Sequence, residues 1–466
     1  MKIAQVGTFD LDNLGDLLFP WVTSRLFASI HGAENQLEYH CFSPTEGAYF
    51  YSDQCQYKNI DALDAEDAVA PFDWVLIGGG DLLRDDDYSL YAIYGEQTPA
   101  LTFTSILSPT VSGTRRLGVL AAGLPYEVEG DFREFLTNSF SRLKAIALRD
   151  SRSAAYLQPC VDVPISIVPD FVHAIPSFLP QAKCDDLVRA MLPELEQGYL
   201  CFQGHGDVCE PVDIAAQTLK EIEQRVGKPF VLIEIGGCLG DTDYLEKLSD
   251  ITGYPLVSRG RFPEITLEQK VAVIAASHGF IGSSLHGNII SNAYGVKNFS
   301  YVGKYSHKIT EYFSNEGHGI LFSDFSLLRG NVERVVGVFE ADGGRKQPLT
   351  ALKTKLILDF ITDLIRSSPG AASAFSPAVD SIYKRAHAKS SFRESIVRSQ
   401  LADLGCRLAA EKQNAVEQVE YRDRLIEELR GLHEAEKENS FAQITYRDKL
   451  IEVLEAQITA LKEKSG

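Results

Sequence analysis

The sequence of 466 residues has no excess of basic side chains. Its 64 Asp and Glu residues outnumber 45 Lys and Arg residues and leave a formal net charge of −19. Binding to nucleic acid needs clustered Lys and Arg against the phosphates, so this balance argues against a nucleic-acid partner. An anionic ligand must instead find a local basic site.

Long hydrophobic runs are also missing from the sequence. No stretch approaches the roughly 20 apolar residues of a membrane-spanning helix. The first residues, MKIAQVGTFDLDNLGD, show neither a charged leader nor a long apolar core. We therefore expect a cytoplasmic protein without a transmembrane segment.

Paired cysteines and a dinucleotide fingerprint are absent as well. The eight cysteines are scattered without CxxC pairs or zinc spacing, and in the cytoplasm they should be reduced. We expect structural cysteines and no metal site. After the first apolar run, Gly7 and Gly15 lie too far apart for a GxGxxG motif.

Short apolar runs alternate with helical patterns in two series, separated near residues 176–196. The first series is KIAQVGTF, WVLIGGG, RLGVLAAG, AIALRD and ISIVPD, and the second is YLCFQGHG, FVLIEIGG, YPLVSRG, HGFIGSSLHG and KNFSYVGK. This alternation predicts parallel strands joined by helices, and hence two doubly wound α/β domains, 1–178 and 190–345. Ligands of such sheets bind outside the carboxyl ends of the strands, where most of the polar and glycine-rich segments fall.

The composition changes after about residue 366. We assign 346–378 to a closing helix and linker, because RSSPGAASAFSP is rich in small residues and proline. Residues 379–466 contain no proline and are rich in Glu, Lys, Arg, Gln, Ala and Leu, which predicts a helical tail.

The tail contains a repeat. YRDRLIEELR from Tyr421 returns 25 residues later as YRDKLIEVLE, which is three heptads plus four residues and predicts a stutter. A coiled-coil seam is indicated by the 3-4-3 spacing of Ile451, Leu454, Ile458 and Leu461. We favour self-association into an oligomer, or docking onto a partner's helix, over a single solvated helix.

The segment GFIGSSLHGNIISNAYGV reads as a strand to about Gly282, a tight loop, and a helix ended by Gly295. His286 is then expected in the loop beside the amino end of that helix. The helix dipole there favours anions and disfavours an imidazolium, whereas a bound phosphate or carboxylate reverses the bias. His286 is therefore a candidate proton donor that is expected to become protonated when an anionic substrate binds. A histidine that only caps the loop explains the pattern equally well.

Further candidates follow other strands of the first series. NLGD contains Asn13 and Asp16, although a turn with a helix-capping Asp is the alternative. Three glycines, Gly78, Gly79 and Gly80, allow a sharp bend or the close approach of a ligand. Asp81 follows them directly.

LRDSRSAAYL places Arg149 at a strand end, where a guanidinium suits carboxylate or phosphate recognition, and Asp150 where it can cap a helix. VPD ends in Asp170, for which a cap is again the alternative. KYSHK supplies cationic groups, including Lys308, after the last strand of the second series, although surface lysine is the commoner explanation.

The ordered set NLGD, GGG, LRDSRSAAYL, VPD, GSSLHG and a following lysine resembles the polysaccharide pyruvyl transferase family over roughly residues 1–325. The resemblance implies two domains arranged as in B-type glycosyltransferases. It also implies transfer of pyruvate from phosphoenolpyruvate, the donor substrate, to sugar hydroxyls of a cell-surface polysaccharide or its precursor, with ketal formation. No cofactor is implied. Such a protein would be cytoplasmic, or peripheral at the membrane face where saccharide precursors are assembled.

The resemblance assigns roles to both domains. In the second, donor-side domain, His286 becomes the general acid. The donor-binding residues, with Arg149 brought in from the first domain, are Arg149, Ser283, Ser284, Gly287, Asn288 and Lys308. In the first, acceptor-side domain, Asp16 becomes the base, and the acceptor-binding residues are Asn13, Gly78, Gly79, Gly80 and Asp81. No metal is required.

One departure from the family pattern concerns the donor site. Family members often carry S-x-R-L-H-G, and Ser284 stands here where that arginine would be. Donor recognition then falls to Arg149 and Lys308. Two alternatives remain: a glycosyltransferase that uses a nucleotide sugar, and a non-catalytic scaffold that acts through the coiled coil.

Overall fold

The structure is a computed structural model of the chain. It describes residues 1–366 apart from 32–36, 48, 84–115, 126, 130–132, 135, 138–139, 141–142, 162, 196, 303–306, 317–318 and 342–349, together with Lys449. The predicted coiled-coil tail, 379–466, lies outside the described residues except for Lys449.

The first domain is built on a seven-stranded sheet in the order β3-β2-β1-β4-β5-β6-β7. All its neighbouring strands are parallel. The strands are β1 (Lys2–Val6), β2 (Glu38–Ser43), β3 (Tyr57–Asn59), β4 (Trp74–Gly78), β5 (Leu117–Ala122), β6 (Ala145–Leu148) and β7 (Ile165–Ile167). The chain order reverses between β1 and β4, which is the crevice where doubly wound sheets bind ligands.

The second domain repeats this plan with a six-stranded parallel sheet, ordered β10-β9-β8-β11-β12-β13. Its strands are β8 (Leu200–Gln203), β9 (Phe230–Ile233), β10 (Leu256–Val257), β11 (Gly279–Gly282), β12 (Lys297–Tyr301) and β13 (Ile320–Phe322). Its crevice lies between β8 and β11. The predicted fold of two doubly wound parallel-sheet domains is confirmed.

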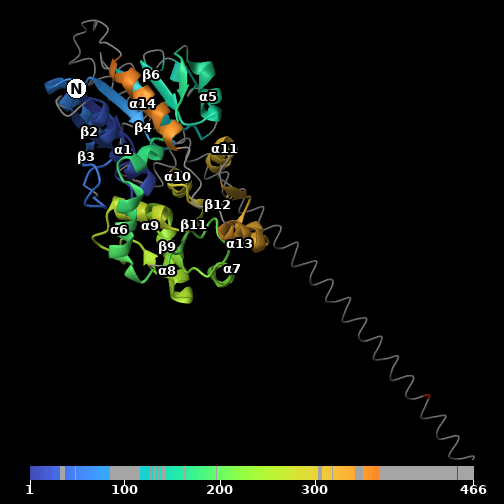
Figure 1. Ribbon diagram of the computed structural model, residues 1–466. Coiled ribbons are helices and arrows are strands. Elements are labelled where there is room, and N and C mark those ends of the chain that lie inside the picture. The colour runs from blue at the N-terminus through green and yellow to red at the C-terminus, as the bar shows by residue number, and fades with distance from the viewer. Residues whose placement is uncertain are drawn as a thin grey trace, which may run out of the picture. The chain divides into compact units, whose positions relative to one another are not determined.

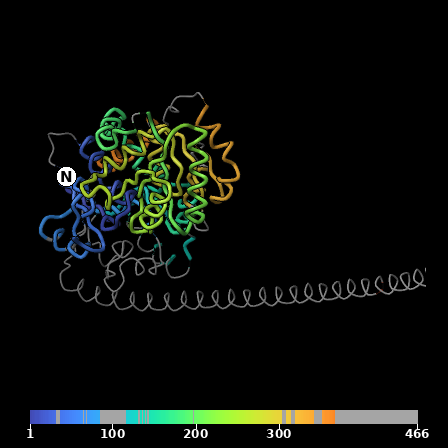
Figure 2. Tube along the Cα trace, turned by 90° about the horizontal axis from the view of Figure 1, so that it is seen from below, coloured from blue at the N-terminus to red at the C-terminus, as the bar shows by residue number. Residues whose placement is uncertain are grey.

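Helices cover both sheets, and the two domains face each other (Figure 1). Figure 2 shows the second domain, green to yellow, in front of the first. The helices are α1 (Leu14–His31), α2 (Leu63–Val69), α5 (Ser151–Leu157), α6 (Gln181–Met191), α7 (Val212–Val226), α8 (Asp241–Thr252), α9 (Leu267–Ala276), α10 (Leu285–Ala293), α11 (His307–Glu316), α12 (Phe325–Arg329), α13 (Val332–Glu340) and α14 (Thr350–Arg366). In the described part of the chain, no helix is both long and apolar enough to cross a membrane.

Each of the ten apolar runs contains a strand, but three strands were not expected. β2 reads EYHCFS, whose charged and polar residues hide the apolar pattern; β3 and β13 have three residues each. β3 and β13 lie at sheet edges, where little apolar sequence is required.

Helix α14 returns from the second domain to the first. It packs against α1 and against the 3₁₀ helix η5 (Phe171–Ser177), as Figure 1 shows for α14 and α1. Its residues Ile357 and Ile361 are fully buried in the same core as α1. The predicted closing helix thus completes the core of the first domain.

Polar contacts tie the loops of the first domain to the second. Asp53 accepts hydrogen bonds from the N–H groups of Leu267 (2.8 Å) and Glu268 (3.1 Å), at the amino end of α9. Arg259 Nη1 lies 3.0 Å from Asp12 Oδ2, and Tyr51 donates to Asp12 Oδ1. The loop between β1 and α1 is therefore fixed from both sides.

Candidate active site

The candidate site lies where the two crevices meet. The β1–α1 loop and the glycine loop after β4 come from the crevice of the first sheet, and the start of α10 comes from that of the second. Asn13 and Gly236 form an isolated antiparallel bridge across the domains, and Leu14 N–H donates to Ile235 O at 2.8 Å. The parallel sheets thus bring chain segments more than 200 residues apart to one place.

His286 lies in the first turn of α10, not in the preceding loop as expected. The helix begins earlier because Ser284 Oγ accepts the N–H of Gly287 as its cap. The His286 ring fills the space beside Gly15, where a Cβ would lie 1.8 Å from its Nδ1. His286 therefore contacts the start of α1 directly.

Asp170 is the charged partner of His286, at 3.5 Å between its Oδ2 and Nε2. Within the part of the chain that the structure describes, neither of these buried atoms is close enough to a partner to form a hydrogen bond. The other oxygen of Asp170 caps η5 through the N–H of Val172, as the alternative reading of VPD expected. Burial would raise the pKa of Asp170, but the interaction of its carboxylate with His286, together with the charge of Arg149, lowers it to about 2. Asp170 is an ionised group beside His286 near neutral pH.

Asp16 occupies the first turn of α1, close enough to His286 to feel its charge. Burial raises the pKa of Asp16 to about 6, against the opposing charges of His286 and Lys308. Asp16 does not cap α1; Asn13 Oδ1 instead accepts the N–H of Gly15 at 3.2 Å. A carboxyl that titrates near pH 6 is suited to act as a general base.

Arg149 is the centre of a charged cluster. Its guanidinium pairs with Asp81 and lies 3.8 Å from Asp150 Oδ2, and its side chain is only 7% exposed. Lys308 Nζ lies 3.7 Å from the second oxygen of Asp81, so Asp81 bridges the two cations. Gly123 makes room for this pair, because a Cβ there would lie 2.4 Å from Asp81 Oδ1.

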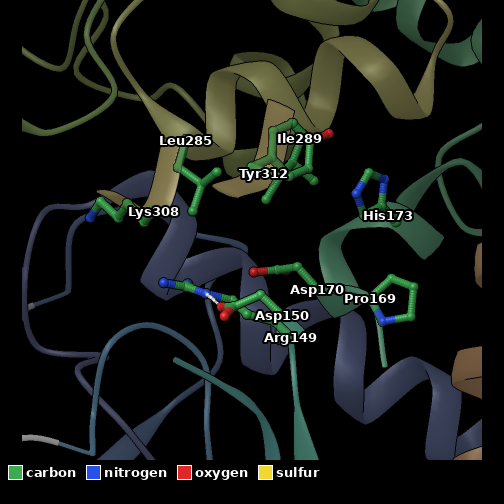
Figure 3. Close-up of a pocket in the computed structure, with 9 residues that line it drawn as sticks. All are labelled: Arg149, Asp150, Pro169, Asp170, His173, Leu285, Ile289, Lys308 and Tyr312. Carbon is green, nitrogen blue, oxygen red and sulfur yellow. Dashed lines mark ion pairs between the residues drawn. The ribbon is translucent and has the colours of Figure 1, made fainter. Parts of the chain in front are cut away.

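A pocket opens beside this cluster (Figure 3). One part of its wall is charged and another is apolar or aromatic. It is lined by Arg149, Asp150, Pro169, Asp170, His173, Leu285, Ile289, Lys308 and Tyr312. Such a wall suits a small anion that carries an apolar group. Within the described residues, no three His, Cys, Asp or Glu side chains gather as ligands of one metal ion.

The residues at the start of α10 that were predicted to bind an anion form hydrogen bonds within the protein instead. The N–H groups of Ser283 and Ser284 both donate to Gln203 Oε1, at 3.0 and 2.9 Å. Gly287 N–H bonds to the Ser284 hydroxyl, and Asn288 N–H to the Ser284 carbonyl. These four residues therefore shape the start of α10, and the structure does not bring them into the lining of the pocket.

The glycine loop lies near Asp16. Gly79 and Gly80 have φ values of +90° and +80°, which favour glycine. A Cβ on Gly80 would lie 3.1 Å from Asp16 Oδ1, and one on Gly78 would meet Leu120. The loop then delivers Asp81 to Arg149, although Asp81 was expected to face the acceptor.

Several lining residues were not predicted. His173 is buried, and its Nε2 lies 3.4 Å from Lys353 Nζ of α14. Burial and the charge of Lys353 lower the pKa of His173 to about 3, so its ring is neutral, while burial lowers the pKa of Lys353 to about 8. Tyr312 stacks on His173, with ring centroids 5.9 Å apart. FVHAIP, the sequence around His173, offers no signal that would reveal this contact.

The geometry defines the class of protein: it is a two-domain α/β protein whose site lies between two doubly wound sheets. Solved structures with this fold include UDP-GlcNAc 2-epimerases. That of Methanocaldococcus jannaschii is 12% identical, with a TM-score of 0.51, and the match covers 79% of this chain and 100% of the epimerase. That of Rickettsia bellii is also 12% identical, with a TM-score of 0.50 and coverage of 79% and 98%. At this identity the likeness shows the fold alone, which is the predicted arrangement of a B-type glycosyltransferase.

The family is shown by sequence. The model of the polysaccharide pyruvyl transferase family matches residues 13–303, and the chain belongs to this family. None of the curated proteins compared matches the chain in sequence. The predicted family membership is confirmed.

Proposed function

We propose that the protein transfers a pyruvyl group from phosphoenolpyruvate to two hydroxyls of a sugar in a cell-surface polysaccharide or its precursor. Family membership supports transfer of this group onto a polysaccharide. The observation that carries the proposal is the pocket where Arg149 and Lys308 stand beside Leu285 and Ile289. Phosphoenolpyruvate has matching parts, namely two anionic groups and an apolar methylene.

The reaction balances with acid and base groups alone. A proton is added to the methylene carbon, and a sugar hydroxyl attacks the adjacent carbon. The bond from that carbon to the phosphate oxygen then breaks, inorganic phosphate leaves, and a second hydroxyl closes the ketal. Of the two hydroxyl protons released, one replaces the proton placed on carbon and the other leaves with the phosphate.

His286 and Asp16 are the acid and base of this scheme. In the proposed scheme, the ionised carboxylate of Asp170 holds the His286 ring in place as it gives its proton to the methylene carbon. Asp16 removes a proton from the attacking hydroxyl. The 3.5 Å gap between His286 and Asp170 is of the kind that tightens when a substrate binds.

In this proposal the donor competes with Asp81. The Asp81 carboxylate sits between Arg149 and Lys308, where it stands in for a carboxylate or phosphate of the donor. A donor anion can exchange with it because the loop before Asp81 contains three consecutive glycines. Arg149 and Lys308 then neutralise the phosphate as it leaves.

The test is calorimetric binding of phosphoenolpyruvate, with uridine diphosphate as the competing ligand. The wild type is compared with His286→Gln, with Asp81→Asn and with the double variant Arg149→Met/Asp81→Asn. The double variant removes both members of the Arg149–Asp81 ion pair, so Asp81 is not left as a charge without its cation. Arg152→Met, which loses only a contact with Tyr156, is the matched control.

We expect phosphoenolpyruvate to bind the wild type, Arg152→Met and His286→Gln with similar affinity. The double variant should bind at least tenfold more weakly than the single variant Asp81→Asn, because it loses a bidentate cation. Binding of uridine diphosphate with no response to phosphoenolpyruvate would favour a nucleotide-sugar glycosyltransferase. If neither ligand binds and His286→Gln keeps full biological activity, the scaffold alternative takes the place of this proposal.

A further inference from the structure

Two buried polar residues connect the loops that carry Asp16 and His286. Gln203 ends β8 and is 3% exposed, and Asp241 begins α8 and is 1% exposed. Gln203 Nε2 donates to Asp241 Oδ2 at 3.1 Å. Gln203 lies at the point where β8 and β11 are neighbours, which is the crevice of the second sheet.

Gln203 fixes the start of the helix that carries His286. Its Oε1 accepts hydrogen bonds from the N–H groups of Ser283 and Ser284, at 3.0 and 2.9 Å. Ser284 in turn caps α10 through Gly287. A change at Gln203 must therefore move the first turn of α10, where His286 lies.

Asp241 fixes the peptide that holds the start of α1. Its Oδ2 accepts hydrogen bonds from the N–H groups of Ile235 (3.1 Å) and Gly236 (2.9 Å). The carbonyl of Ile235 accepts the N–H of Leu14 at 2.8 Å, and Leu14 is the first residue of α1. Asp16 is two residues further along, so its position depends on the same peptide.

We propose that Gln203 and Asp241 are positioning residues that set the spacing between His286 and Asp16 across the two domains. The pair bonds to both loops, whereas a residue that only stabilises the second domain would need neither. The partly buried N–H groups of Ser283 and Ser284 lose their acceptor when Gln203 is removed, so the loop must shift to find another. A shift of about 1 Å lowers a catalytic rate by about 100-fold.

The changes in rate that this inference predicts rest on the proposed function. In the full chain, we expect Gln203→Met to lower kcat by roughly 30- to 100-fold. The Kd of phosphoenolpyruvate should stay within about twofold, because Arg149 and Lys308 do not contact the pair. Asp241→Asn should keep kcat within about threefold, since its amide oxygen can still accept the N–H groups of Ile235 and Gly236, whereas Asp241→Leu should behave like Gln203→Met.

Thr218→Val is the matched control for lost stability. Thr218 is a buried polar residue of the same domain, 2% exposed, whose hydroxyl donates to Ile214 O within α7. This variant should lose a comparable hydrogen bond with no effect on kcat. Equal losses of kcat in Gln203→Met and Thr218→Val would overturn the inference.

A second readout does not depend on catalysis. In protein labelled with ¹³C-histidine, the ring signal of His286 is assigned by its loss in His286→Gln. It should move in Gln203→Met and Asp241→Leu, and stay in place in Thr218→Val and Asp241→Asn. An unmoved signal in the first two variants overturns the inference even if the wild type transfers no pyruvate. Failure of transfer with a moved signal overturns the proposed function alone.

Discussion

Two aspartates of the site show how position decides the chemistry of one side chain. Asp170 faces His286 and Arg149, and its interactions with them outweigh burial, so its pKa falls to about 2. Asp16 is partly buried, and there burial outweighs the opposing interactions with His286 and Lys308, so its pKa rises to about 6. Asp170 is thus a permanent anion, whereas Asp16 can exchange a proton.

The raised pKa of Asp16 predicts a stability change with a definite sign. The folded state binds a proton more tightly than the unfolded state, so its stability falls as pH rises from about 4 to about 6. Asp16→Asn removes this effect and should raise the free energy of unfolding by about 1–2 kcal/mol at pH 8. Urea unfolding should show little gain at pH 4; an equal gain at both pH values would contradict the pKa.

Asp16 should also shape the pH dependence of the wild-type rate. As a general base it must be ionised, so kcat/KM should fall as pH decreases below about 6. Asp16→Glu keeps a carboxyl and should keep an acid limb at a lower rate. A flat profile between pH 5 and pH 7 in the wild type would assign the base to another group.

Because Asp81 bridges Arg149 and Lys308, we expect the loss of its charge to raise the affinity for phosphoenolpyruvate. Asp81→Asn removes the charge that competes with the donor for Arg149 and Lys308, so phosphoenolpyruvate should bind about tenfold more tightly in calorimetry. Asp324→Asn is the control, because Asp324 lies outside the lining of the pocket and asparagine preserves its cap on α12. A weaker or unchanged affinity in Asp81→Asn would show that Asp81 only supports Arg149.

At the level of elements, the start of α1 requires a glycine at position 15, where helix propensity would favour alanine. An alanine within a helix is normally more stable than a glycine by about 1 kcal/mol. Gly15→Ala should nevertheless lower kcat by at least tenfold and destabilise the protein, because its Cβ would meet the His286 ring. Gly337→Ala in α13, where a Cβ meets nothing within 4 Å, should stabilise it in thermal unfolding. Similar behaviour of the two variants would contradict the packing of His286 on Gly15.

The sequence predicted elements better than contacts between them. Strands such as WVLIG are apolar throughout because both faces of a parallel sheet are buried, and they were found. The order of motifs identified Arg149, His286 and Asp16. In contrast, His173 contacts Lys353 and Gln203 contacts Ser283, both far along the chain, and no local pattern records such contacts. The roles assigned to the site residues remain predictions.

Helix α14 lies outside the family match but belongs to the core. Ile357 is fully buried, whereas Leu356 beside it is 43% exposed. Ile357→Ala should therefore lower the free energy of unfolding by about 2–4 kcal/mol, and Leu356→Ala by less than about 1 kcal/mol. Denaturant unfolding of the full chain measures both. Equal effects would mean that α14 is not packed on α1 and η5.

For the whole molecule, the two domains form a single site because their loops are interlocked. Asp53 caps α9, Arg259 pairs with Asp12, and α14 crosses back to the first domain. These contacts hold His286 and Asp16, which come from different sheets, together. Assembly beyond one chain must then come from surfaces outside this site.

The heptad-like spacing near the carboxyl end predicts that chains associate through the tail. In the full chain, Leu454→Asp together with Ile458→Asp places two charges in the expected seam, where an apolar stripe is needed for pairing. Light scattering should show that the mass falls from an oligomer to a single chain, while kcat/KM stays within about twofold because the site is built within one chain. Glu452→Gln together with Glu455→Gln, outside the seam, is the control and should remain oligomeric. If the wild type is already a single chain at concentrations where coiled coils pair, the predicted self-association is wrong, and the tail would instead bind the helix of a different partner.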